Sequence, residues 1–450
     1  MFWRKLLLFV LLATIAAGCS FSAKPKHDGQ LVIMYPYKVD YYEQTYVAPF
    51  KEKYPELQIS VVYGEEKVGA GQFTDEAYSR LIESEKPDVV FLLDKQYAQL
   101  SGENRLTDLG PFVQKDHFDV ESFYPPLISY LKSYGQGKLE GLAADYRTNA
   151  LYYNEELFER YGVPVPKGTL TWDEVLNLAG RFAAVSDSDR TVFGFDNYDP
   201  IEQSNALALI RHIGEAQGLS MFDEKNRRIV VNDGRWKPIF EMVLENLRSG
   251  AIHPNALKNE VKAPFQSPFL NGEAAMMTSN SDMVFFLDEL ARITGDEGLS
   301  PKRWNIVPAP VYSARKDRGI TLSTNVYAIP FESDSKEDAW NFIKFVNSDV
   351  TMRALSKTGF KLQSRVQYVP PLEGRNIQAF FPDSAAEVVL PNRPDLPGFI
   401  DGLNRTAVAQ LQGVLDGRLT LDEALKAIEQ EGQALWREAS DRLERTLPNR

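Results

Sequence analysis

The sequence predicts an α/β fold divided into two lobes. Apolar, strand-like runs alternate with helix-like segments, which is the pattern of proteins that pack helices against a sheet. One run, DVVFLL at residues 88–93, is typical of a parallel strand buried on both faces. The chain has 450 residues, whereas a single hydrophobic core stops growing at ~250–300, so two domains or lobes are expected.

The first elements after the N-terminus predict a strand, a helix and a second strand. LVIM at residues 31–34 is expected to be a strand, and residues 41–54 a helix that contains Pro49. ISVVY at residues 59–63 is rich in β-branched residues and predicts the second strand. With the run at 88–93, these segments give the alternation on which the fold class depends.

Later elements are marked by capping signals. TWDE at Thr171, SKED at Ser335 and TLDE at Thr420 each fit a capping box, and apolar residues at i, i+3, i+4 and i+7 follow each one. Three helices are therefore expected to begin there. The polar run DEKNRR at residues 223–228 separates two short apolar runs and predicts a surface hairpin.

The N-terminus carries the features of a secretory signal. Two basic residues precede the apolar stretch 6–17, which is shorter than the ~20 residues that a membrane-spanning helix needs. The single cysteine of the chain, Cys19, follows in TIAAGCS, which resembles a bacterial lipobox except that Ala16 stands where Leu is favoured. Lipidation of Cys19 is expected after removal of residues 1–18. The alternatives are an ordinary signal peptide and a buried core cysteine.

Composition argues against several classes of function. The net charge is −12 and no stretch is dense in Lys and Arg, so nucleic acid is not an expected partner. Four scattered histidines without an HExxH motif give no metal site, and we expect no metal and no cofactor. The loop at Gly64 lacks the lysine of a P-loop, having Ala70 in its place, and no GxSxG motif supplies a nucleophile. No catalytic residue is predicted.

Several segments together resemble one known family. Residues 139–162, LEGLAADYRTNALYYNEELFERYG, and the following VPVPKGTLTWDEVLNLA are similar to bacterial extracellular solute-binding proteins of family 1, the maltose-binding-protein-like receptors of ABC importers. Further segments with the same resemblance follow in the family's order: PFKEKYPELQISVV from Pro49, PDVVFL from Pro87, FLNGEAAMMTSNSDM from Phe269, RWNIVPAPV from Arg303 and SKEDAWNFIKFVNSD from Ser335. Lipid-anchored receptors of this kind are usual in bacteria that lack an outer membrane.

The resemblance implies a periplasmic-binding-protein-like fold of type II, with two α/β lobes, a ligand cleft between them and hinge strands that join them. The hinges are expected near residues 144–148 and 318–322. The implied domains are the signal peptide 1–18, a flexible tether 19–30, an N-terminal lobe of 31–145 with 320–365, and a C-terminal lobe of 146–319 with 366–450.

Candidate ligand-binding residues are polar or aromatic side chains that follow a predicted strand, because ligands of open α/β sheets bind beyond the carboxyl ends of strands. The residues chosen in this way are Tyr35, Tyr37, Asp94, Gln96, Asp196, Tyr198, Ser279, Asn280 and Asp282. The hinges that the resemblance implies add Asp145, Arg147 and Asn149 at the first crossing and Thr324 and Asn325 after the second.

Some of these candidates have a competing structural interpretation. Arg147 would hold hydroxyls or a carboxylate of the ligand, or would pair with Asp145 and brace the hinge. Asp196 would contact the ligand or form a solvated turn. Met283 stands where many relatives carry a tryptophan that stacks on a sugar, which weakens the sugar assignment. Four aromatic side chains have a core interpretation instead: Trp236, Trp304, Trp340 and Tyr327.

The resemblance implies a receptor rather than an enzyme. We expect it to be a monomer on the outer face of the cell membrane, held there only by the lipid on Cys19. It would capture a sugar or oligosaccharide and deliver it to the permease subunits of an ABC transporter, and Arg147 keeps an acidic sugar possible. The alternatives are a cell-surface lipoprotein glycoside hydrolase and a ligand-sensing lipoprotein with a signalling partner.

Overall fold

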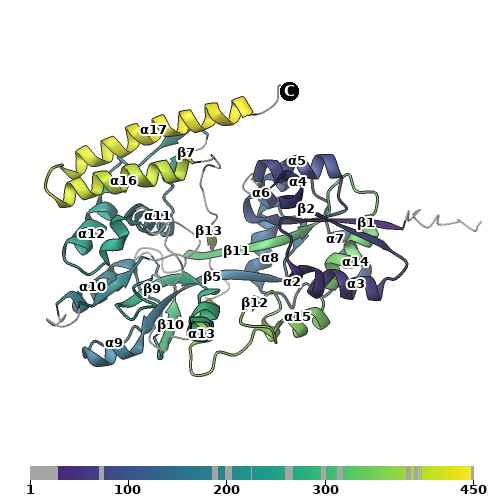
Figure 1. Ribbon diagram of the computed structural model, residues 1–450, viewed down its shortest axis with the longest axis horizontal. Coiled ribbons are helices and arrows are strands. Elements are labelled where there is room, and N and C mark those ends of the chain that lie inside the picture. Colours follow the sequence, from purple (N-terminus) through teal and green to yellow (C-terminus); the bar gives the residue numbers. More distant parts are fainter. Residues whose placement is uncertain are drawn as a thin grey trace, which may run out of the picture. The chain divides into compact units, whose positions relative to one another are not determined.

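The computed structural model describes residues 29–69, 75–184, 191–197, 205–223, 225–258, 267–294, 301–311, 318–381, 387–389, 394, 396 and 398–446. The backbone packs into two compact units (Figure 1). The first unit takes its described residues from 1–91 and 329–343, and the second takes them from 92–328 and 344–450. Cys19 and Tyr198 lie outside the described residues.

The first unit is built on a parallel sheet. Strand β1 (Gln30–Tyr35) pairs with β2 (Gln58–Tyr63) along its whole length and with the start of β3 (Val89–Leu93), and both pairings are parallel. The strands predicted at residues 31–34, 59–63 and 88–93 are thus confirmed. Leu31, Ile33 and Met34 of β1 and the first two residues of β3 are fully buried, as expected for a central parallel strand.

The helix predicted at residues 41–54 is confirmed, but it is not a regular α-helix. It consists of α2 (Asp40–Tyr42), the π-helical segment η1 (Glu43–Val47) and α3 (Ala48–Lys53). The N–H of Ala48 bonds to the carbonyl of Glu43, five residues back. The irregular segment ends next to Pro49, which has no N–H to continue the α-helical hydrogen-bond pattern.

The rest of the first unit consists of α4 (Gly64–Val68), α5 (Asp75–Glu85) and the first part of α14 (Lys336–Val346). Two buried side chains, Asp88 and Tyr78, connect these segments to the sheet through hydrogen bonds. The Asp88 carboxylate accepts hydrogen bonds from the Val32 N–H at 2.9 Å and the Ser333 hydroxyl at 2.7 Å. The Tyr78 hydroxyl donates to the Phe91 carbonyl at 2.8 Å. These bonds tie α5 and the segment before α14 to the sheet.

The second unit is organised around one long strand, β5 (Asp145–Asn154). The first half of β5 pairs with β11 (Arg318–Ala328) and β12 (Leu362–Gln363), and the second half pairs with β9 (Ala274–Asn280) and β10 (Trp304–Pro308). All four pairings are antiparallel, so the sheet here is not the parallel one that alternating strands and helices favour.

Shorter strands complete the sheets of this unit. Strand β6 (Phe193–Asp196) runs parallel to β9, β4 (Gly141–Leu142) pairs with β11, and β13 (Glu387–Val389) runs parallel to β11. A separate antiparallel pair joins β7 (Phe222–Asp223) to β8 (Arg228–Ile229), which confirms the hairpin predicted at residues 223–228.

Helices surround these strands. They are α6 (Asp94–Gly102), α7 (Gly110–Asp116), α8 (Pro125–Tyr134), α9 (Glu155–Arg160), α10 (Trp172–Ala183), α11 (Ala206–Ala216), α12 (Lys237–Arg248), α13 (Met283–Thr294), α15 (Asp349–Leu355), α16 (Phe399–Leu415) and α17 (Leu421–Thr446), with short 3₁₀ segments η2 (Pro254–Leu257), η4 (Val366–Tyr368) and η5 (Ile377–Phe380). Helices α16 and α17, yellow-green and yellow in Figure 1, pack side by side. None of the helices in the described part of the chain has the length and hydropathy needed to span a bilayer.

The predicted helix starts are confirmed. The Thr171 N–H donates to the Glu174 carboxylate at 2.7 Å and the Glu174 N–H to the Thr171 hydroxyl at 3.2 Å, which is a complete capping box before α10. The same reciprocal pair joins Thr420 and Glu423 before α17, and α14 begins directly after Ser335.

The four aromatic residues with a core interpretation are buried, which confirms that interpretation: Trp236, Trp304, Trp340 and Tyr327.

Candidate ligand-binding site

One face of β5 carries a row of half-buried polar side chains. Asp145, Arg147 and Asn149 alternate with residues that are buried on the opposite face. In the antiparallel register, Ser323 of β11 lies opposite Arg147, and Asn280 of β9 lies opposite Asn149. Directly opposed residues share a face of the sheet. The five side chains therefore form one hydrogen-bonding surface, which we call the β5 polar row.

Arg147 is paired with a carboxylate distant in the sequence. Its Nε donates to Asp282 Oδ2 at 2.6 Å, and the Asp282 N–H donates to Asn280 Oδ1 at 2.8 Å in the turn between β9 and α13. Burial alone would lower the pKa of Arg147, but Asp282 and then Asp145 outweigh burial and raise it. The guanidinium is therefore firmly charged.

Asp145, the predicted alternative partner of Arg147, lies 3.7 Å from Lys361 Nζ through its Oδ2. The ion pair of Arg147 is with Asp282 instead, because the turn after β9 brings that carboxylate to the end of the guanidinium. Asp145 still acts on Arg147 through its charge. Asp145, the neighbour in sequence, thus raises the pKa of Arg147 from a longer distance than Asp282, which the pairing of β5 with β9 brings close.

Asp94 is a half-buried carboxyl group at the first residue of α6. Its Oδ1 accepts hydrogen bonds from the Tyr130 hydroxyl at 2.8 Å and from the Thr324 N–H at 3.1 Å. Burial raises the pKa of Asp94 to about 6, although both hydrogen bonds and the charge of Arg147 oppose the rise. The Thr324 hydroxyl in turn donates to the Asp145 carbonyl at 2.5 Å. Asp94 and Thr324 are thereby fixed next to the β5 polar row.

Three other predicted residues of this unit are buried within the fold. Gln96 accepts the Leu93 N–H at 2.9 Å through its side-chain oxygen, at the start of α6. Asp196 accepts the hydroxyl of Ser267 at 2.7 Å and a backbone N–H. Ser279 lies opposite Ala150 on the buried face of β5, and its hydroxyl has no hydrogen-bond partner among the described residues. Gln96 thus caps the start of α6, and Asp196 holds the distant segment at Ser267 and Phe269. Ligand contact by any of the three residues stays a prediction.

Asn325 is half-buried on β11, one residue after Thr324. Tyr35 and Tyr37 belong to the first unit. The Tyr35 ring stacks on Tyr42 with the centroids 3.7 Å apart, and Tyr37 is 45% exposed. Their contact with a ligand also stays a prediction.

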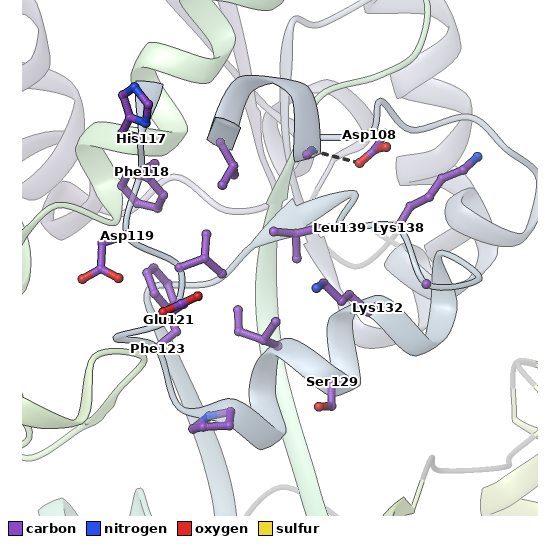
Figure 2. A pocket seen from close by; sticks show the side chains of 16 residues that line it. Asp108, His117, Phe118, Asp119, Glu121, Phe123, Ser129, Lys132, Lys138 and Leu139 are labelled. Atoms are coloured by element: carbon purple, nitrogen blue, oxygen red, sulfur yellow. Dashed lines mark hydrogen bonds between the residues drawn. The ribbon is translucent and has the colours of Figure 1, made fainter. Parts of the chain in front are cut away.

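A groove of about 1030 Å³ lies beside α8 (Figure 2). Tyr130 faces Asp94, whereas Ser129 and Lys132 of the same helix line the groove. None of the groove residues was predicted, because helical spacing alone does not distinguish a groove wall from a solvated face. The residues that line it are Asp108, Gly110, Val113, His117, Phe118, Asp119, Val120, Glu121, Phe123, Pro125, Ile128, Ser129, Lys132, Gly137, Lys138 and Leu139.

Sequence reasoning also missed Tyr130, Ser323 and Lys361, which surround the predicted residues. Tyr130 has the helical spacing of a core residue and gives no other signal. Ser323 could have been found, because it lies one residue before the predicted Thr324 on the same strand. Within the described part of the chain, no three His, Cys, Asp or Glu side chains are grouped as metal ligands.

The family model described as bacterial extracellular solute-binding protein matches residues 36–352. The chain belongs to this family. The predicted resemblance is therefore confirmed. Members of the family are extracellular or periplasmic binding proteins that work with ABC transporter permeases.

Two relatives of this solute-binding protein have different ligands in their names. The arabinooligosaccharide-binding protein of Bacillus subtilis is 24% identical over 355 residues, covering 76% of this chain and 74% of the relative. The sn-glycerol-3-phosphate-binding periplasmic protein of Escherichia coli is 22% identical over 337 residues, covering 71% and 72%.

The fold of this chain is similar to that of several solved structures. A sugar transporter protein from Rhizobium etli, crystallised in an open conformation, superimposes with a TM-score of 0.64 at 20% identity, covering 90% of this solute-binding protein and 99% of the other chain. Such neighbours are two-lobed proteins with a mixed sheet and many helices. The predicted α/β, two-lobed solute-binding fold is confirmed.

Proposed function

We propose that this solute-binding protein is an extracytoplasmic receptor for a sugar or oligosaccharide, which it delivers to an ABC import permease. The β5 polar row is the observation that carries the proposal. It combines amide, hydroxyl, carboxylate and guanidinium groups from three paired strands, β5, β9 and β11, and these groups both donate to and accept from sugar hydroxyls. The name of the Bacillus subtilis relative supports a carbohydrate ligand.

The proposed mechanism breaks no bond. Hydroxyls of the ligand would bind to Arg147, Asn149, Asn280 and Ser323, and the ligand would shift the equilibrium toward a closed form by its higher affinity for that form. The predicted lobes, with boundaries near residue 145 and residue 320, would close on the ligand, and the closed form would dock on the permease.

Lipid anchoring is part of the proposal and rests on the N-terminal sequence. The signal peptide 1–18 followed by Cys19 would place the mature protein on the outer face of the cell membrane as a lipidated monomer. Labelling of growing cells with a tagged palmitate tests this. Label on the full-length protein that disappears in Cys19→Ser supports anchoring, and equal labelling of the two proteins refutes it.

The ligand is tested by a thermal-shift screen of the purified protein against mono- and oligosaccharides, amino acids and short peptides. A ligand that binds only the folded state raises the melting temperature. We expect the shift to come from a carbohydrate and to be lost in Arg147→Gln. The matched control is Arg235→Gln, since Arg235 forms an exposed ion pair with Asp233 at 2.7 Å. A shift with peptides alone would refute the carbohydrate assignment.

A glycoside hydrolase is the second candidate. The observation that favours it is Asp94, a half-buried carboxyl whose pKa is raised to about 6, as in the acid group of many glycosidases. Chromatography of each stabilising sugar after prolonged incubation separates the two functions. A receptor returns the sugar unchanged, whereas a hydrolase releases product that is lost in Asp94→Asn.

A further inference from the structure

We propose that this site selects an uncharged ligand and that Asp282 is the residue that determines this specificity. The inference deepens the proposed function and rests on it. Membership in the family does not decide the question, because one relative is named for an oligosaccharide and another for a phosphorylated glycerol.

The charged groups around Arg147 carry no net positive charge. The carboxylates of Asp94, Asp145 and Asp282 all act on Arg147. The ammonium of Lys361 lies 3.7 Å from Asp145 and is the second cation of the group. Three carboxylates against two cations leave one negative charge when all are ionised, and no net charge when Asp94 is protonated. In neither state does this group offer the net positive charge that would favour an anion.

The ion pair with Asp282 uses only part of the guanidinium of Arg147. Its Nε is occupied by Asp282 at 2.6 Å, and its two Nη groups have no hydrogen-bond partner among the described residues. Arg147 can therefore still donate hydrogen bonds to ligand oxygens while its charge is offset by Asp282. A hydroxyl or ring oxygen accepts such a bond without repulsion from the carboxylates. A carboxylate or phosphate in the same place would lie close to Asp282 as a like charge.

Asp282 is partly exposed, and its backbone is held in place. The Asp282 side chain is 35% exposed and that of Arg147 is 25% exposed, so solvent screens the charges of this pair only in part. A ligand on the β5 polar row can still reach both side chains. The Asp282 N–H is fixed by Asn280 at 2.8 Å, which orients the turn independently of the carboxylate. Substitution of the carboxylate by an amide should therefore change the charge of the site and leave the turn in place.

The test compares neutral and anionic probes on the full chain by titration calorimetry. The neutral probes are the carbohydrates that raise the melting temperature, and the anionic probes are glucuronic acid, galacturonic acid, glucose 6-phosphate and glycerol 3-phosphate. We expect the wild-type protein to bind a neutral carbohydrate and to bind none of the anions more tightly. In Asp282→Asn, the ratio of anion affinity to neutral-ligand affinity should rise at least about tenfold.

Two further variants separate specificity from a merely structural role. Asp282→Glu keeps the charge and should keep the wild-type preference, and Asp233→Asn removes the carboxylate of the exposed Arg235 pair and should leave the preference unchanged. A gain in anion affinity that falls with added salt in Asp282→Asn supports the charge argument. The inference is overturned if the wild-type protein prefers an anion, or if Asp282→Asn loses affinity for both kinds of probe equally. If no carbohydrate of either kind binds the wild-type protein, the proposed function is wrong and the inference falls with it.

Discussion

Replacement of Asp94 by asparagine should alter how the free energy of unfolding depends on pH. The carboxyl has a pKa of about 6 in the folded protein against an ordinary value of 3.8. The folded state therefore binds this proton more tightly than the unfolded state does. The stabilisation is fully present below pH 3.8 and is lost as the pH rises through 6. A difference of about two pKa units at 1.36 kcal/mol each corresponds to about 3 kcal/mol.

The asparagine variant keeps the oxygen that accepts from the Tyr130 hydroxyl and the Thr324 N–H, so the local structure should persist. Urea unfolding followed by tryptophan fluorescence from pH 4 to pH 8 measures the effect. The stability of the wild-type protein minus that of Asp94→Asn should fall by up to ~3 kcal/mol across this range. As a control, Asp416→Asn should give a nearly flat difference across this range, because hydrogen bonds from Arg418 lower the pKa of Asp416 and its titration therefore lies below pH 4. Parallel pH profiles for the wild type and Asp94→Asn would refute the reasoning.

Three further substitutions test the packing and the helix starts by urea unfolding. Gly214→Ala should destabilise the protein by about 1–3 kcal/mol, since a Cβ there would lie 2.2 Å from the Trp236 ring; an unchanged midpoint would contradict this close contact. Thr171→Ala removes a helix cap and should lose ~1 kcal/mol, whereas Thr171→Ser should lose little; equal losses would argue against the cap. Ser333→Ala leaves the buried Asp88 carboxylate without one donor and should lose about 1–3 kcal/mol, and a neutral effect would show that this bond is not needed.

Local patterns predicted the elements of the fold but not all of their pairing. The strands near residues 31–34, 59–63 and 88–93 were found because each is a short run rich in apolar or β-branched residues. The antiparallel partners of β5 were not found. They come from segments more than 100 residues away, and a strand's sequence does not state which distant strand will pair with it.

The candidate site was likewise predicted in part: its residues were found, but their pairing was not. Arg147 was predicted from its position at the expected first hinge, and the ion-pair partner considered for it was Asp145, two residues away in the sequence. The observed partner, Asp282, is 135 residues away and reaches Arg147 only because β9 pairs with β5. Local sequence therefore predicts which residues are candidates for ligand binding, and strand pairing determines which of them come into contact.

The alternating faces of β5 limit how this protein can change during evolution. A single inserted or deleted residue between Asp145 and Asn154 would turn Arg147 and its neighbours on the row toward the buried face, or break the pairing with one pair of neighbouring strands. A new ligand preference can therefore arise here only by exchange of side chains at fixed positions. Changes of length would have to be confined to the connections outside the strand.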